Sequence, residues 1–254
     1  MMKHVWMAGV CLAFAGEACA ARALTSEELA QRCDPRALRF VSPLVTGKSA
    51  GQGVDVEADV RNTPYVTLIV TDGGDSYACD HADWLDARFT GAFGEKRLSQ
   101  LDWTHEQCGW NSPAKNKSVA GGGFKVLGQA FADGIGTHSP GLLVYRVPEG
   151  AETFKARAAL DDSGVKQHAE APSSVQFIVF AGIPSLDLLT SLRLAAVPDP
   201  AARERFEALV ATFGADVANE YLLLRREIAQ KPKTHGGVAD EDTQIGRASC
   251  RERV

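Results

Sequence analysis

The chain has 254 residues, of which 45% are hydrophobic and 23% are charged, and 27 Lys and Arg stand against 32 Asp and Glu. The resulting net charge of -5 argues against nucleic acid or an anionic membrane surface as the partner, because both attract basic proteins.

Residues 1–20 have the pattern of a secretory signal peptide. Lys3 and His4 give a basic start, residues 5–15 form an apolar run too short to span a bilayer, and Ala18-Cys19-Ala20 fits a small-residue cleavage site. We therefore expect a secreted or periplasmic protein. After these residues, no apolar run reaches the ~20 residues that a transmembrane helix needs.

Residues 244–254 (QIGRASCRERV) lack periodicity and resemble the translation of a sequencing-library adaptor. We expect the natural protein to continue past Thr243 into a further domain. The two ends hold four of the Lys and Arg and two of the Asp and Glu, so 23 basic and 30 acidic residues remain. The expected mature part is therefore more acidic than the whole chain.

Residues 21–53 are predicted to form a short helix and a linker. Thr25-Ser26-Glu27-Glu28 has the form of a capping box, which starts a helix running towards Cys33. Residues 42–53 contain Pro and Gly and have the composition of a linker.

Residues 54–182 are predicted to form one all-β sandwich. Residues 54–60 alternate apolar and charged side chains, which indicates a half-exposed strand, and residues 65–71 (YVTLIVT) indicate a buried one. Turn residues bound five further strand-length segments, which are residues 97–103, 124–127, 129–132, 142–147 and 153–160. The second and third of these segments are predicted to form a hairpin that turns near Gly128. Cys79 and Cys108 fall in loop-like stretches, and whether they pair stays open.

An aspartate-rich stretch follows the second predicted strand. Asp72, Asp75, Asp80 and Asp83 lie within twelve residues, interrupted by a Gly pair, and carboxylates in a flexible loop suit Ca²⁺. The alternative is a purely structural loop in which the aspartates cap turns. The spacing is not that of an EF-hand.

Two tryptophans have different expected roles. Trp103 shares one face of a predicted strand with Ser99 and Leu101, so we expect it in the core. Trp110 lies in a loop by composition, next to Asn111, and an exposed indole can lie against the apolar C–H face of a sugar. His138 is either half-buried and bonded to the backbone, or faces a ligand hydroxyl.

Catalysis has little support in the sequence. Asp161 and Asp162 are adjacent, so in a strand they point to opposite faces and cannot serve as the opposed carboxylates of a glycosidase. No His-Glu-x-x-His motif and no nucleophile elbow occurs. We expect a non-enzymatic module.

Residues 183–243 are predicted to be helical. Asp199 and Pro200 begin a helix that Gly214 ends, and a second helix covers about residues 216–230. Their apolar faces need a partner surface, which is either the sandwich or the region expected past Thr243.

Several short motifs in a fixed order resemble the NPCBM/NEW2 family of carbohydrate-binding modules, which also occurs beside glycoside hydrolases. They are residues 70–75, 80–84, 98–103, 109–110, 115–118, 134–138, 154–157, 160–162 and 174–179. The resemblance implies a galactose-binding-like jelly roll over residues 54–182, which binds terminal sugars through loops at one end and, in some members, holds a structural Ca²⁺.

These observations together predict a non-catalytic module that binds galactoside-like glycans. Its expected sugar contacts are Trp110, Asn111, His138, Asp161 and Asp162. The alternative is a scaffold sandwich that positions a missing catalytic or haem domain and binds no sugar.

Overall fold

The computed structural model describes residues 22–167 and 173–194, together with residues 204, 207, 208, 211, 212 and 214. The predicted signal peptide, the predicted helix over residues 216–230 and residues 244–254 lie outside the described residues. So does most of the predicted helix that begins at Asp199. Among the described residues, no helix has the length and apolar character that crossing a membrane requires.

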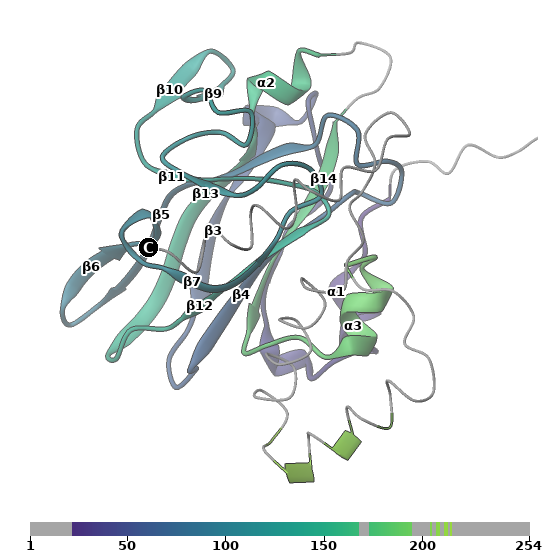
Figure 1. Cartoon of the computed structure of the whole chain (residues 1–254), viewed down its shortest axis with the longest axis vertical. Coiled ribbons are helices and arrows are strands. Elements are labelled where there is room, and N and C mark those ends of the chain that lie inside the picture. The colour runs from purple at the N-terminus through teal and green to yellow at the C-terminus, as the bar shows by residue number, and fades with distance from the viewer. Residues whose placement is uncertain are drawn as a thin grey trace, which may run out of the picture.

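The protein is an all-β sandwich of two six-stranded antiparallel sheets (Figure 1). The first sheet has the order β1 (Leu38–Val41), β14 (Ser174–Ala181), β4 (Tyr65–Thr71), β12 (Gly141–Arg146) and β7 (Trp103–Gln107), with β2 (Val45–Thr46) beside β14. The second sheet has the order β3 (Gly53–Asp59), β13 (Ala151–Leu160), β5 (His81–Gly91), β11 (Gly134–His138) and β8 (Ala114–Lys115), with β6 (Gly94–Arg97) beside β5. The chain changes sheet at most connections, as in a jelly roll.

The short elements surround these sheets. β9 (Phe124–Val126) and β10 (Gln129–Phe131) form a separate hairpin. The α-helices are α1 (Ser26–Ala30), α2 (Asp162–Val165) and α3 (Leu186–Ser191), and the 3-10 turns are η1 (Pro35–Ala37), η2 (Ala50–Gln52) and η3 (Leu98–Gln100). Figure 1 shows the hairpin and α2 together at one end of the molecule, with α1 beside α3.

The main core fills the space between the two sheets. Trp84 of β5 meets Phe177 of β14 edge to face at 5.1 Å, and Phe154 of β13 contacts Trp84 and Phe89 from its own sheet. All four side chains are fully buried. Aromatic residues of this size supply much of the apolar area that stabilises such a sandwich.

Both outer faces are also partly covered. Leu29 of α1 and Leu188 of α3 pack with Ile69 and Ile178 on the outer face of the first sheet. This explains why residues 65–71 show no alternation, since β4 is buried on both faces. On the second sheet, the β9–β10 hairpin places Phe124 over Leu85.

Several sequence predictions are confirmed. The helix starting at Thr25 is α1, with both hydrogen bonds of the capping box. The strands predicted over residues 54–60 and 65–71 are β3 and β4, and the hairpin turns at Leu127 and Gly128. Trp103 packs against the core, edge to face with Tyr145 at 6.4 Å.

Three predictions about elements were wrong. The strand expected over residues 97–103 is broken by η3, where the amide of Leu101 bonds back to Leu98 and turns the chain. The linker expected over residues 42–53 contains β2, and β1 ends just before it; both strands pair with β14 and so belong to the sandwich. The aspartate-rich loop was expected to include residues 81–84, which instead begin β5.

Candidate functional site

Four aromatic side chains meet at one end of the sandwich. His81 begins β5 and His138 ends β11, and these two residues are cross-strand partners with ring centroids 5.4 Å apart. Trp110, from the loop between β7 and β8, stacks on His81 at 5.3 Å with an interplanar angle of 12°. Tyr77, from the β4–β5 loop, approaches His138 at 6.2 Å. We call these four residues the end-loop aromatic cluster.

Exposure increases outward through the cluster. His81 and His138 are both 3% exposed, Trp110 is half-buried, and Tyr77 is 47% exposed. The two histidines therefore form the buried base of the cluster, and the Trp110 and Tyr77 rings from the loops lie over them.

Each histidine ring is fixed by a hydrogen bond. Nδ1 of His138 donates to the carbonyl oxygen of Ser139 at 2.6 Å, and Nδ1 of His81 lies 2.8 Å from Oγ of Ser163. Burial lowers the pKa of His81, although the nearby Asp161 carboxylate opposes the shift. His138 thus has the first of its two predicted arrangements, with a bond to the backbone, and also contacts Trp110 at 5.8 Å.

Close backbone contacts explain two glycines near the cluster. A Cβ atom on Gly109 would lie 1.8 Å from the carbonyl oxygen of Ser139, and one on Gly164 would lie 2.2 Å from that of Cys79. Real Cβ atoms never approach so closely, so only glycine lets these loops pack against the end of the sheet.

Asn111 supports the loop that carries Trp110. Its backbone has a positive φ of 59°, a conformation that asparagine tolerates well, and its side-chain Nδ2 donates to the carbonyl oxygen of Val119 at 2.9 Å. Cys108 donates from Sγ to the carbonyl oxygen of Trp110. Within the ranges that the structure describes, Cys33, Cys79 and Cys108 form no disulfide with one another, so the bond between Cys79 and Cys108 that the sequence left open is not made.

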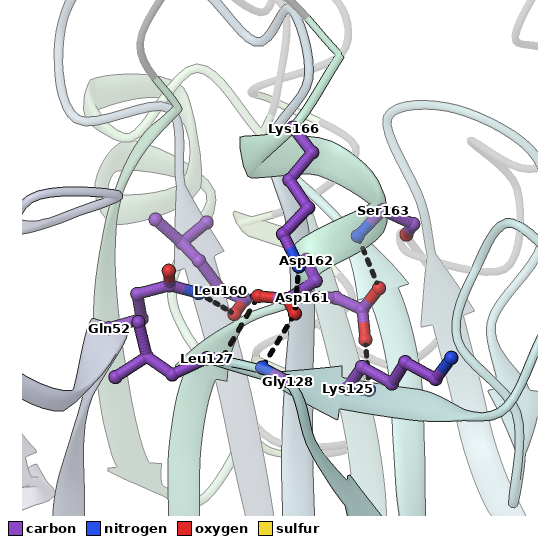
Figure 2. A network of polar contacts seen from close by, with 9 residues as sticks. All are labelled: Gln52, Lys125, Leu127, Gly128, Leu160, Asp161, Asp162, Ser163 and Lys166. Carbon is purple, nitrogen blue, oxygen red and sulfur yellow. Dashed lines mark hydrogen bonds and ion pairs between the residues drawn. The ribbon is translucent and has the colours of Figure 1, made fainter.

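Asp161 and Asp162 lie at the start of α2 and face the β9–β10 hairpin (Figure 2). Asp161 accepts hydrogen bonds from the amides of Ser163 and Lys125, both at 2.8 Å. It therefore caps α2 and holds the first strand of the hairpin at once.

Asp162 holds the tip of the same hairpin. Its carboxylate accepts from the amides of Leu127 at 3.0 Å and Gly128 at 2.8 Å, and from the side chains of Gln52 and Lys166. Burial alone would raise the pKa of Asp162, but these hydrogen bonds outweigh it and the pKa lies below its usual value. Asp161 and Asp162 are only 1% and 4% exposed, so their bonding favours a structural role over the predicted sugar contact.

Three of the four aspartates predicted as Ca²⁺ ligands are bonded to other groups of the protein, and two of them, Asp75 and Asp80, share Ser174. Asp72 accepts from the amide of Gly74 and forms an ion pair with Arg193 at 3.0 Å, and Asp75 accepts from Oγ of Ser174. Among the residues that the structure describes, no three His, Cys, Asp or Glu side chains gather as a metal site. The predicted ligand set is therefore not formed.

Asp80 and Asp83 are the two deeply buried members of the predicted ligand set. Asp80 accepts from Oγ of Ser139 at 2.6 Å and from the amide of Ser174 at 2.9 Å, and its burial raises its pKa to about 8. Asp83 is fully buried in β5, and this burial, together with the adjacent Asp161, raises its pKa well above the usual range. Neither residue belongs to a group of three or more metal-ligating side chains in the described part of the chain, and the oxygens of Asp80 are bonded to Ser139 and Ser174.

Sequence reasoning identified Trp110 and His138 but missed the other two members of the end-loop aromatic cluster. His81 and Tyr77 were given no role, because the register that pairs β5 with β11 is not visible in the sequence. Ser163 was missed for the same reason, since it reaches His81 only through the fold. The Asp80-His81 and Gly136-Thr137-His138 runs were the available signal, one histidine at an end of each strand.

The described part of the chain is thus a β-sandwich domain that carries a half-buried tryptophan and an exposed tyrosine on the loops at one end, the part of such a scaffold where recognition residues concentrate. The NPCBM/NEW2 domain model matches residues 34–90 and 94–194, and the chain therefore belongs to the NPCBM/NEW2 family. The matched region starts before β1 and ends after α3, so it covers the whole described sandwich. Membership of this family indicates a carbohydrate-binding module, a kind of domain that is generally non-catalytic. Comparisons with curated proteins and with solved structures gave no match.

Proposed function

We propose that the sandwich is a non-catalytic module that binds a terminal, galactoside-like sugar through the end-loop aromatic cluster. The observation that carries the proposal is the position of Trp110, which is a half-buried indole on a loop at the end of a rigid sheet in a member of this family. Loops held by such a scaffold are where recognition residues concentrate.

The chemistry of the cluster suits a sugar. The indole offers an apolar surface to the C–H groups of a pyranose, and the exposed Tyr77 offers a hydroxyl that can bond the hydroxyls of the sugar. Asn111 is exposed beside Trp110 and adds amide chemistry at the same loop. A small number of polar groups placed around an aromatic surface is typical of sites that bind small ligands.

We also propose that the module is exported to the periplasm or the medium and is joined to a further domain of the same chain. The support is the signal-like pattern of residues 1–20 and the family's occurrence beside glycoside hydrolases. The glycan is then the partner that brings the neighbouring domain to its substrate.

The first test replaces the indole. Trp110→Ala should abolish retention on a glycan array, because the apolar surface for the sugar is lost, while the melting temperature stays close to that of the wild type. Phe93→Ala is the matched control, since Phe93 is an aromatic residue of 36% exposure in the β5–β6 turn, at the far end of β5 from His81. Retention that survives Trp110→Ala would remove this role and favour the scaffold alternative.

A further inference from the structure

We propose that His81 is a positioning residue that sets the plane of the Trp110 indole, and that Ser163 at the start of α2 sets the plane of His81. This inference rests on the proposed function, since it assigns the parts of the fold that prepare the sugar-binding ring.

The contact between the two rings is a stack. An interplanar angle of 12° at 5.3 Å means that the imidazole lies along the face of the indole rather than at its edge. His138 approaches the same indole at 61°, so it limits sliding but does not share the stacking plane. The orientation of Trp110 therefore follows that of His81 most directly.

The backbone of His81 is held firmly on both sides. On one side it pairs with His138 of β11, and on the other its carbonyl oxygen accepts from the amide of Asp161 at 2.9 Å. Gly164 lies so close that a Cβ atom there would be 3.0 Å from Cβ of His81. The base of the side chain is thus fixed, but the ring can still turn about its last torsion, which is broad for histidine.

Ser163 removes that remaining freedom. Its Oγ lies 2.8 Å from Nδ1 of His81, and its own amide is held by the carboxylate of Asp161 at 2.8 Å. The same carboxylate accepts from the amide of Lys125 in the hairpin, as Figure 2 shows. A hydroxyl that is itself anchored at the backbone can select one plane for the imidazole.

The Trp110 indole is therefore held in one orientation before a sugar binds. Ordering a side chain on binding weakens affinity, and a ring that is already held avoids this cost. Releasing the stack should therefore weaken retention by about three- to tenfold without removing the indole that makes the contact.

The test compares four variants with the wild type and with Trp110→Ala. Ser163→Ala removes the hydroxyl, His81→Ala removes the ring, and His81→Phe keeps a flat ring without the nitrogen. Ser191→Ala is the matched control, because Ser191 also donates a helical hydroxyl bond, to Leu188 of α3, and is not part of the end-loop aromatic cluster. Retention is measured on the array, and the Trp110 indole N–H signal is followed by NMR without any glycan.

Ser163→Ala and His81→Ala should both shift or broaden the Trp110 signal and weaken retention. His81→Phe should behave like Ser163→Ala, because its ring also lacks the bond to Ser163, and Ser191→Ala should change neither readout. If Ser163→Ala and His81→Ala leave the signal and the retention unchanged while Trp110→Ala abolishes retention, the positioning role is wrong and the sugar-binding role stands. If Trp110→Ala leaves retention unchanged, the proposed function is wrong instead. Should His81→Ala fail to fold, Ser163→Ala and His81→Phe decide the question.

Discussion

Asp80 shows how a single buried residue can connect the sheets and respond to pH. It precedes β5 of the second sheet, and its carboxyl group accepts from the amide of Ser174 at the start of β14 in the first. Burial in this position raises its pKa to about 8, so it is mostly protonated at neutral pH. The carboxyl acts as a neutral crosslink near the end-loop aromatic cluster.

The pH dependence of stability follows from the sign of this shift. The unfolded chain loses the proton near pH ~3.9, whereas the folded state keeps it up to about pH 8. Between these values the folded state binds more protons, so the free energy of unfolding should fall as the pH rises from ~4 to ~8. Asp83, whose pKa is also raised, acts in the same direction.

Asp80→Asn should flatten part of this pH dependence, because asparagine is neutral at every pH and keeps an acceptor for Ser174. The measurement is urea unfolding of wild type and variant at pH 5 and pH 8.5. Asp55→Asn, an exposed aspartate of β3, is the control and should keep the wild-type slope. An Asp80→Asn slope equal to the wild type would show that Asp80 does not titrate in this range.

At the residue scale, the sequence identified single side chains better than their partners. Trp110 could be predicted as a loop aromatic because Gly, Asn and Pro surround it. The stack with His81 could not, since it depends on the β5–β11 register and on the approach of α2. The adjacent Asp161 and Asp162 are easily noticed in the sequence, but only the fold shows that their carboxylates accept hydrogen bonds from backbone amides.

At the scale of single elements, the β9–β10 hairpin contains a residue that does not suit the backbone conformation of its turn. Leu127 and Gly128 occupy its turn with φ of 51° and 81°, and a positive φ at both positions is typical of a type I′ turn. Glycine suits this conformation and leucine does not. The two amide bonds to Asp162 hold the turn in place despite this strain.

Leu127→Asn should therefore stabilise the domain by about 0.5 kcal/mol, because asparagine tolerates the left-handed conformation and the leucine side chain is 63% exposed. Leu127→Ala is the matched control, since it removes the same side chain without favouring positive φ. The urea midpoint of Leu127→Asn should exceed those of wild type and Leu127→Ala. Equal urea midpoints for Leu127→Asn and Leu127→Ala would contradict the inference that the positive φ of Leu127 strains the turn.

Elements were predictable where local pattern and burial agree. β4 is an unbroken run of β-formers, and α1 has its capping box. β5 was hidden because a central strand rarely contains a buried Asp83 or a residue such as Asp86, whose φ of 48° interrupts the pairing with β13. β1 and β2 are too short to show a strand pattern in the sequence, and they are recognised as strands only by their pairing with β14.

At the scale of the whole molecule, the end-loop aromatic cluster lies at one end of the packed sandwich. The inter-sheet core and the helices on the first sheet make a rigid body, while the cluster sits where β5 begins and β11 ends. The charge of the chain adds nothing that would attract a polyanion. The sugar-binding proposal accordingly assigns recognition to ring surfaces and a few polar groups.

The most direct test of this account is NMR mapping of the domain with the glycan that the array retains best. Signals from Tyr77, Trp110 and Asn111 should shift most, and those from Phe93 and the β5–β6 turn should stay unchanged. Shifts concentrated at the β5–β6 turn, or no shift at the cluster when the glycan is saturating, would contradict the assignment of the end-loop aromatic cluster as the sugar-binding site.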